Sequence, residues 1–579
     1  MKKLLLSLLF LGAPSALLAQ VLDAWAPPAA QAPIELRVTD PLNGDIQFKP
    51  VHGTLLPDGR VMLFGPVGVN ARAAWLRPTP IGQPLPTTVR LTPDNVPVDV
   101  DTPVTVTDPA TGNRIHIEET IFCSGHALTA DGGIFVAGGT LLWSFYEAAT
   151  QTTVNYIYGL PNVTQYSLAG GTWSRGENMR GTGETGSNMR WYGTVTRLGD
   201  ERMLVSSGYE LASIQVRQPG QPVHNHGSTL NRSVEVMLPA GGGTVVSPHA
   251  ETPQAIWNPD YTHAFQMPYG LPLVPDNTIL MFGDAGIPVY FFPDGTPGSR
   301  WAPLTASFRP GTRSVDAPNH GTASVLLPMR ATNFEWGYAN GSVLQAGGGL
   351  DSAMERSIDV FEISSSSWFH GDLGLRRRFP ATVLLPDGKV MVVSGYDATN
   401  VNPLLRNAHY LDLRPPTSLT TGLAASGEVR GYHNVALLLP DGRVLVAGGR
   451  SRGSDPADPE DEKPSLRYLY PPYLTPLASP PPRPAIVAAP QTIGYGSSFT
   501  VEVAGGPVSE VVLMGLGSMT HAIDMNQRYV QLAATPQGAG SVQVTGPANV
   551  QTAAPGHYML FVLNANRVPS VASFVRLVR

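Results

Sequence analysis

Five residues of this chain have the side chains needed for redox chemistry at a metal. Cys123 is the only cysteine among 579 residues, so it cannot form an internal disulfide. The phenols of Tyr192 and Tyr432 and the imidazoles of His433 and His521 complete the set. This mixed nitrogen and oxygen set suits Cu(II), whereas zinc prefers closed tetrahedral sites and calcium prefers carboxylates. A tyrosine beside a thiol, with copper and oxygen, can become a thioether-linked phenol that stores a radical. The alternative is that Cys123 is a buried, inert thiol.

A repeated sequence motif would bring these residues together in the fold. A short apolar run, a turn such as Pro-Asp-Gly, a second apolar run and one or two glycines recur seven times. The copies lie at 52–65, 123–139, 192–208, 263–286, 320–349, 379–395 and 432–449. Each copy predicts a β-hairpin, because Pro-Asp-Gly supplies turn geometry between two β-type runs. Apolar residues on both faces require the hairpins to pack on one another, and the spacing is typical of propeller blades. We therefore predict a seven-bladed kelch-type β-propeller over residues 48–480 rather than a set of unrelated hairpins.

The candidate residues share one position in this repeat. Cys123, Tyr192 and His433 each lie eight residues before the aspartate of their turn, and Phe379 does the same in its own copy. Equivalent positions of a propeller face the same end of the central axis. The register therefore predicts that these side chains converge, with Tyr432 adjacent, although they lie far apart in the sequence.

The composition and the two ends of the chain indicate its localisation, its fold class and the partners it is expected to lack. Residues 1–19 resemble a signal peptide, with a basic start and a short apolar run, so we expect a secreted protein with no membrane span. Residues 20–47 would lead into the propeller. Residues 481–579 contain short alternating β-type segments and predict a small immunoglobulin-like sandwich, which makes the chain all-β. A net charge of −6 and the lack of a basic run argue against a nucleic-acid partner.

The segments around the candidate residues resemble the copper-radical oxidases, the family of galactose oxidase and glyoxal oxidase. The resemblance rests on IFCSGHALTADGGIFVAGG, RWYGTVTRLGDERMLV, VRGYHNVALLLPDGRVLVAGG, GLGSMTHAIDMNQR and the C-terminal GHYMLFVLNANRVPSVASFVRL. It covers nearly the whole chain after residue 19. Members of this family have a seven-bladed kelch propeller followed by an immunoglobulin-like domain, and a loop of that domain supplies a copper ligand within the propeller axis.

The resemblance implies a role for each candidate residue. Cys123 would form the thioether with Tyr192, which would be a copper ligand and the radical-bearing residue. Tyr432 would be the axial ligand and the base that accepts the substrate proton, and His433 and His521 would be the imidazole ligands. The implied reaction oxidises a small aldehyde, as its hydrate, or a primary alcohol, and reduces O₂ to H₂O₂. We expect a monomer.

Two departures bear on the substrate. Galactose oxidase stacks a tryptophan on the cross-linked tyrosine, but this sequence has Glu210, beside Tyr209, at the corresponding place. Trp143 could shield the radical from another blade, and Tyr209 and Phe379 could line the pocket. The sugar-binding module of galactose oxidase is also absent before the first repeat. Both departures favour small aldehydes over galactose. A non-catalytic kelch scaffold and a copper site without a radical stay open as alternatives.

Overall fold

The computed structural model describes an all-β molecule, as the sequence predicted. The described residues are 33–40, 44–65, 73–94, 104–219, 224–239, 242–253, 261–268, 275–282, 287–304, 321–330, 336–349, 356–397, 407–414, 418–421, 428–450, 462–475, 479–538 and 540–579. Among them the only helical segments are two short 3-10 helices, His249–Glu251 and Pro472–Leu474. No helix in these ranges is long and apolar enough to cross a membrane. The predicted signal peptide, 1–19, lies outside the described residues.

All seven repeats form antiparallel hairpins, and each hairpin opens a four-stranded unit. The first three units are β3 (His52–Leu55), β4 (Val61–Phe64), β5 (Ala73–Leu76) and β6 (Thr88–Asp94); β9 (Gly125–Leu128), β10 (Ile134–Ala137), β13 (Asn162–Ser167) and β14 (Thr172–Asn178); and β15 (Thr194–Arg197), β16 (Met203–Ser206), β20 (Val234–Met237) and β21 (Gly243–Ser247). The fourth and fifth are β22 (His263–Gln266), β23 (Ile279–Phe282), β24 (Pro288–Phe291) and β25 (Trp301–Pro303), and β26 (Ala323–Leu326), β27 (Val343–Ala346), β28 (Ser357–Glu362) and β29 (Ser367–Asp372).

The last two units complete the series. They are β30 (Arg378–Leu384), β31 (Val390–Tyr396), β32 (His409–Asp412) and β33 (Ser418–Thr421), and β34 (Asn434–Leu438), β35 (Val444–Gly448), β36 (Ser465–Leu469) and β1 (Ile34–Asp40), with β2 (Gly44–Gln47) paired to β1. The segment 20–47 therefore does more than lead into the repeats, because its strand β1 is the outer strand of the seventh unit. The two hairpin strands of every unit are buried along almost their whole length, which explains why their sequences are apolar on both faces.

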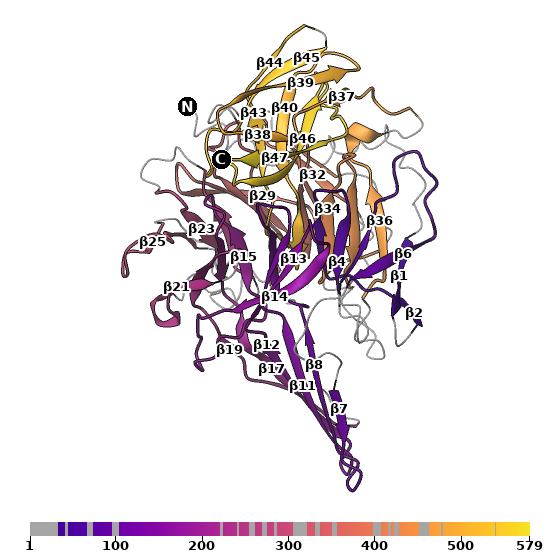
Figure 1. The fold of residues 1–579 in the computed structure, drawn as a ribbon, viewed down its shortest axis with the longest axis vertical. Coiled ribbons are helices and arrows are strands. Elements are labelled where there is room, and N and C mark those ends of the chain that lie inside the picture. Colours follow the sequence, from indigo (N-terminus) through magenta and orange to yellow (C-terminus); the bar gives the residue numbers. More distant parts are fainter. Residues whose placement is uncertain are drawn as a thin grey trace.

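A second sheet projects from one end of these units (Figure 1). Its strands are β7 (Val104–Thr107), β8 (Arg114–Thr120), β11 (Thr140–Glu147), β12 (Thr152–Gly159), β17 (Tyr209–Arg217), β18 (His224–His226) and β19 (Thr229–Leu230). They come from three insertions: before β9, between β10 and β13, and between β16 and β20. We call them together the projecting sheet. The sequence analysis did not predict it.

The C-terminal residues form two sheets that pack around their own apolar core. One sheet contains β37 (Ala485–Ala488), β39 (Ser498–Ala504), β44 (Ala534–Pro536) and β45 (Ser541–Thr545), and the other contains β38 (Thr492–Gly494), β40 (Glu510–Gly515), β43 (Tyr529–Leu532), β46 (Gly556–Leu563) and β47 (Ser573–Val578). Their facing residues, among them Val501, Leu513 and Val562, are fully buried. This is the sandwich that the alternating β-type segments predicted.

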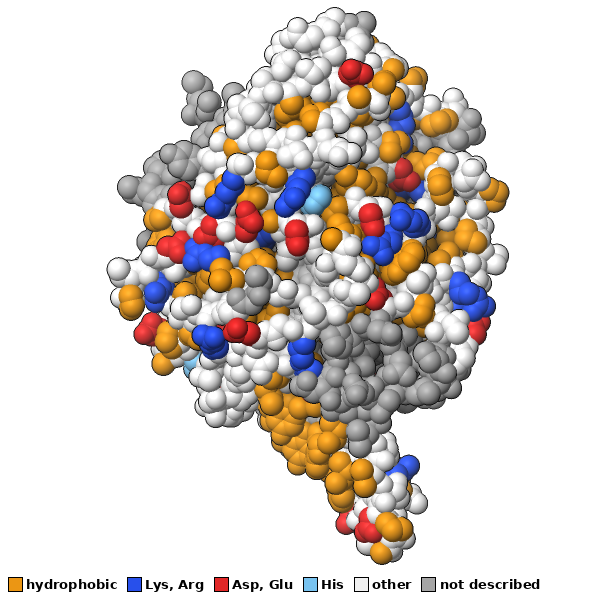
Figure 2. Space-filling model, in the orientation of Figure 1, with side chains coloured by type: hydrophobic (Ala, Val, Ile, Leu, Met, Phe, Trp, Pro, Cys, Tyr) orange, Lys and Arg blue, Asp and Glu red, His pale blue; other side chains and the backbone are white. Residues whose placement is uncertain are grey.

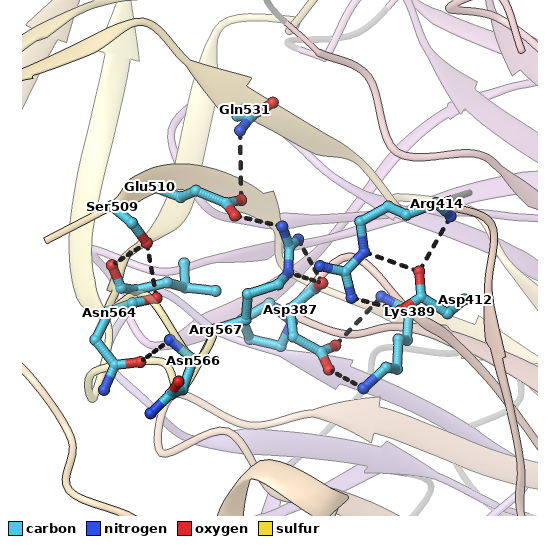
Figure 3. A network of polar contacts seen from close by, with 12 residues as sticks. Asp387, Lys389, Asp412, Arg414, Ser509, Glu510, Gln531, Asn564, Asn566 and Arg567 are labelled. Carbon is cyan, nitrogen blue, oxygen red and sulfur yellow. Dashed lines mark hydrogen bonds and ion pairs between the residues drawn. The ribbon is translucent and has the colours of Figure 1, made fainter. Parts of the chain in front are cut away.

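The C-terminal domain is fixed to the sixth unit by a polar network (Figure 3). The Arg567 guanidinium donates from Nε to the backbone carbonyl of Asp387 at 2.9 Å and pairs with the Glu510 carboxylate. Asp387 lies in the turn between β30 and β31, and its carboxylate pairs with Lys389 at 3.0 Å. The contact therefore joins the turn of one hairpin directly to the sandwich.

A hairpin of the C-terminal domain then reaches among the seven units. Its strands are β41 (Ser518–Thr520) and β42 (Ile523–Asp524). Strand β41 pairs with β3, where Thr520 faces His52, and β42 pairs with β26, where Ile523 faces Ser324. The hairpin also contacts β9, β30 and β34. Since it touches the first strands of five units, it lies at the centre of the assembly.

Candidate metal centre

The residues chosen from the repeat register lie at equivalent places in the structure. Cys123 and Tyr192 each lie two residues before the first strand of their unit, β9 and β15, and His433 lies directly before β34. Cys123, Tyr192 and His433 all adopt left-handed backbone conformations, with φ of 62°, 65° and 68°. Bulky residues adopt this region at a cost of roughly 1–3 kcal/mol each, and such strain clusters at functional sites. The shared conformation confirms that these positions are structurally equivalent.

His521 lies at the tip of the hairpin formed by β41 and β42, which we call the central hairpin. Its Nε2 lies 3.9 Å from the Cys123 sulfur. One ligand atom from each of Cys123, His433 and His521 lies within 4.8 Å of the others, and all three side chains are buried. The His521 ring centroid is 4.6 Å from that of Tyr192 and 4.9 Å from that of Tyr432. The structure thus brings together all five residues that the sequence analysis selected.

Hydrogen bonds orient both imidazoles toward this cluster. The Nδ1 of His433 lies 2.5 Å from the Glu462 carboxylate, and the Nδ1 of His521 lies 2.5 Å from the hydroxyl of Thr520. With Nδ1 engaged, each ring presents Nε2 to the centre. Burial lowers the pKa of both histidines well below its ordinary value, so both rings are neutral and retain a lone pair.

Two polar atoms of the cluster lack a hydrogen-bond partner within the described part of the chain. They are the Tyr192 hydroxyl and the Nε2 of His433, and both are fully buried. A buried polar atom without a partner is costly, so a ligand at this point would stabilise both atoms. Burial raises the pKa of Tyr432 well above its ordinary value, and the neighbouring Cys123 raises it further.

This donor set fits a copper ion. Two imidazole nitrogens and two phenol oxygens match the preference of Cu(II), and the rings of Tyr192 and His433, which carry the unpartnered atoms, each lie 4.6 Å from the His521 ring, centroid to centroid. No carboxylate touches the cluster directly among the described residues, because Glu462 bonds to the far nitrogen of His433. The set therefore fits calcium and magnesium poorly.

Two aromatic rings stack on Tyr192, and neither was predicted. The Trp191 ring lies 3.6 Å from the Tyr192 ring, centroid to centroid, and the two planes differ by 12°. The Tyr261 ring lies 4.8 Å away at 25°. The Nε1–H of Trp191 donates to the Thr140 hydroxyl at 2.9 Å, which fixes the indole in place. Trp191 therefore covers Tyr192 from the adjacent position in the chain.

None of the three residues proposed for shielding or for the pocket stacks on Tyr192. Trp143 lies on the projecting sheet, where its ring contacts Tyr156 at 5.1 Å, and Tyr209 packs edge-on against Trp191 at 5.8 Å. Phe379 contacts the Tyr432 ring at 4.8 Å, so it borders the cluster without covering Tyr192. The expectation that Trp143 covers Tyr192 is replaced by the observed stacking of Trp191.

Glu210, which stands at the place of the galactose oxidase tryptophan, has a structural role. Its buried carboxylate accepts the backbone N–H groups of Thr185 and Ser187, both at 2.8 Å. This pair of bonds holds the segment that precedes Tyr192 and leaves Glu210 outside the cluster.

The sequence did contain signals for some of the residues that were missed. Trp191 stands in the RWY motif, and a left-handed Tyr192 is what allows adjacent rings to stack. Tyr261 lies two residues before β22 with φ of 62°, but a longer hairpin loop puts it fifteen residues before Asp276 and so out of register. No sequence pattern indicated that His52 or Glu462 would lie beside the candidate site. His52 accepts the backbone N–H of Cys123 at 2.9 Å, and so holds the thiol residue from the first unit.

The chain is similar in sequence to several known proteins. Residues 483–577 match the family model "Galactose oxidase-like, Early set domain". The chain is 28% identical over 411 residues to an aldehyde oxidase of Vitis pseudoreticulata, covering 65% of this chain and 73% of that protein. It is 28% identical over 293 residues to an aldehyde oxidase of Arabidopsis thaliana (44% of this chain, 47% of that protein) and 32% identical over 209 residues to galactose oxidase of Gibberella zeae (34% and 29%). The chain thus spans less than half the length of these last two relatives.

A solved structure shares the fold. It is described as a novel fungal alcohol oxidase of the AA5 family in complex with copper. The two structures superpose with a TM-score of 0.63 at 19% identity, over 92% of this chain and 98% of the other. At this identity the match shows the fold. Together with the early-set domain and the sequence relatives, it supports a relationship to the copper-radical oxidases, the family of galactose oxidase and glyoxal oxidase.

Proposed function

We propose that the seven units close into a seven-bladed kelch-type propeller, followed by an immunoglobulin-like domain over residues 481–579. Support comes from the contacts between first strands of successive units: β9 with β15, β15 with β22, β26 with β30, β30 with β34, and β34 with β3. The central hairpin contacts β3, β9, β26, β30 and β34, as an element on the propeller axis would. Because β1 completes the seventh unit, the propeller would begin before residue 48.

We propose that the propeller axis holds one copper ion, bound by Tyr192, Tyr432, His433 and His521. The observation that carries this proposal is the convergence of buried Tyr192, His433 and His521 with partly buried Tyr432, together with the unpartnered polar atoms of Tyr192 and His433. Cys123 lies in the same apolar cluster as Tyr192, and the Tyr192 N–H donates to the Cys123 carbonyl at 2.8 Å. The two residues are thus neighbours, as a thioether between the Cys123 sulfur and the Tyr192 ring requires.

Each protein residue would have a distinct part in the reaction. Copper bound here would supply a one-electron acceptor, which together with an oxidised Tyr192 makes a two-electron couple. Tyr432 would take the proton from the substrate hydroxyl, since burial favours its protonated form once the proton arrives. Tyr192 would accept the hydrogen atom from the substrate carbon. The substrate loses two electrons and two protons, and O₂ takes up both to give H₂O₂.

The substrate class follows from this geometry and from the relatives. We infer a primary alcohol or the hydrate of a small aldehyde, because a gem-diol offers Tyr432 a hydroxyl and Tyr192 a carbon-bound hydrogen in the same arrangement. Two of the relatives are named aldehyde oxidases. We infer that the protein acts outside the cytoplasm, where the expected signal peptide would direct it.

The decisive experiment is an oxygen-dependent peroxide assay on the copper-loaded, oxidised protein with glyoxal, methylglyoxal, simple primary alcohols and galactose. We expect peroxide from the small aldehydes or alcohols. A Tyr432→Phe variant should retain copper and lose roughly 10²–10⁴-fold in turnover, as expected for a positioned base. Tyr146→Phe, on the projecting sheet, is the matched control and should be unaffected. Peroxide from none of these substrates would support the non-catalytic scaffold instead.

A further inference from the structure

The projecting sheet is not covered by a second layer on either face. Every residue of β11 from Leu141 to Glu147 is partly exposed, and β12 is partly exposed from Thr152 to Tyr158. A sheet with one buried face shows alternating burial along each strand. Uniform partial exposure of successive residues therefore means that both faces of this sheet lie open among the described residues. Figure 1 shows the sheet extending away from the rest of the molecule.

The two faces differ sharply in chemistry. The strand register places twelve apolar or aromatic side chains on one face: Val106, Ile115, Ile117, Leu141, Trp143, Phe145, Val154, Tyr156, Tyr158, Leu211, Ile214 and Val216. The same face also carries Glu119 at its base and Glu147 and Thr152 at its outer end. We call this the apolar face. The opposite face carries many polar side chains: Arg114, His116, Glu118, Thr120, Ser144, Thr153, Asn155, Ser213, Gln215 and Arg217. Figure 2 shows hydrophobic side chains gathered over the projecting sheet and charged ones near its tip.

Contacts at the base of the sheet show where each face points. Thr140, on the polar face, bonds to Trp191 of the metal centre. Glu119, in register with Leu141 of the apolar face, lies 3.5 Å from Arg175 on β14 of the second unit. The polar face thus turns toward the metal centre and the apolar face turns away from it. A role in holding the substrate does not explain the apolar face.

We propose that the apolar face is the interface with a second copy of this chain, in a two-fold dimer of face-to-face projecting sheets. Four strands of about eight residues present roughly 500 Å² of flat face, at about 3.3 Å per residue and 4.8 Å per strand. Two such faces bury about 1,000 Å², which is the lower threshold for a specific interface. An exposed apolar patch of this size is typical of an interaction surface.

The chemistry of the face favours a second copy over other partners. The charged side chains Glu119 and Glu147 lie at the two ends of the apolar face, and Glu119 pairs with Arg175. The centre of the face is apolar, so it favours no partner of opposite charge. Two identical apolar sheet faces are complementary to each other, and stacked sheets of this kind are a standard solution for burying one apolar face. The polar face stays open in such a dimer, and the approach to the metal centre on that side stays free. This inference is independent of the proposed activity, and it replaces the monomer expected from the sequence.

The test is the mass of the full-length mature protein in sedimentation equilibrium over a wide concentration range. We expect a dimer for the wild type. Val106→Lys and Phe145→Lys place an ammonium group in the interface, and each should weaken dimerisation at least about tenfold. Val106 is 59% exposed, so its substitution does not threaten folding. Ser144→Lys, on the polar face of the same strand as Phe145, is the matched control and should leave the dimer intact.

Three results would overturn the proposal. A wild type that is monomeric throughout would show that another segment of the chain or a different partner covers the face. A dimer that survives both lysine substitutions would use another surface. Equal loss in Ser144→Lys and Phe145→Lys would show a general effect on the sheet rather than on its apolar face. Copper content and the circular dichroism of each variant verify that the fold is retained.

Discussion

Replacing Trp191 by leucine should make the Tyr192 radical harder to form and shorter-lived. The indole stacks on the phenol ring at 3.6 Å and is held by its hydrogen bond to Thr140. Leucine keeps apolar volume at the position but removes the π-system. The change therefore tests the stacking itself rather than the packing around it.

The size of the effect follows from the stacking energy. Aromatic pairs contribute about 0.5–1.5 kcal/mol beyond the burial of their area. If that energy is gained mainly in the radical state, its loss raises the one-electron potential of Tyr192 by roughly 20–65 mV, since 59 mV corresponds to a factor of ten. Water would also approach the ring more easily, and the radical would decay faster.

The assay is a redox titration of the copper-loaded protein, followed by its optical and paramagnetic signals, with decay of the oxidised form timed in air. Trp143→Leu is the matched control, because Trp143 contacts Tyr156 on the projecting sheet rather than Tyr192. An unchanged potential and lifetime in Trp191→Leu, at full copper occupancy, would refute the shielding role. A larger change of potential or lifetime in Trp143→Leu would show that Trp143 shields the radical instead of Trp191.

Three further outcomes are expected. After aerobic copper loading the chain should be two hydrogens lighter than its sequence, and Cys123→Ser should restore the calculated mass in intact-protein mass spectrometry. Glu462→Gln should weaken copper binding about 10–100-fold in competition titrations, as the loss of a carboxylate behind a histidine ligand typically does. Glu428→Gln, which removes a carboxylate that pairs with Arg430 and Ser465, should not. Burial raises the pKa of Asp524 from 3.8 to about 6, so its stabilising contribution is present below the unfolded pKa and is lost as the pH rises through about 6. Denaturant titrations should show the stability of the wild type falling by about 3 kcal/mol relative to Asp524→Asn across that window.

The sequence predicted the repeat framework well because its signal is local. A turn motif between two apolar runs specifies a hairpin within about fifteen residues, and all seven hairpins are present. The register of Cys123, Tyr192 and His433 carried real structural information, since their φ values agree within a few degrees. Periodicity thus located the candidate site before any long-range contact was known.

The residues that the sequence did not predict depend on long-range geometry. The projecting sheet joins three insertions that are separated by whole strands of the units, and no local pattern shows that they pair. Glu462 reaches His433 from 29 positions away, and His52 reaches Cys123 from 71. Trp191 was hidden for another reason. Adjacent side chains normally point apart, and only the left-handed backbone of Tyr192 brings the two rings together.

The same backbone strain explains why the centre must be assembled from the whole chain. Cys123, Tyr192, His433 and His521 all adopt positive φ, at roughly 1–3 kcal/mol each, and none of them is a glycine. Such conformations persist only where surrounding contacts over-determine them. His52 holds Cys123 from the first unit, and Arg567 fixes the sandwich from which His521 extends. The fold therefore holds the donors in place before any metal binds, and the site depends on the C-terminal domain as much as on the repeats.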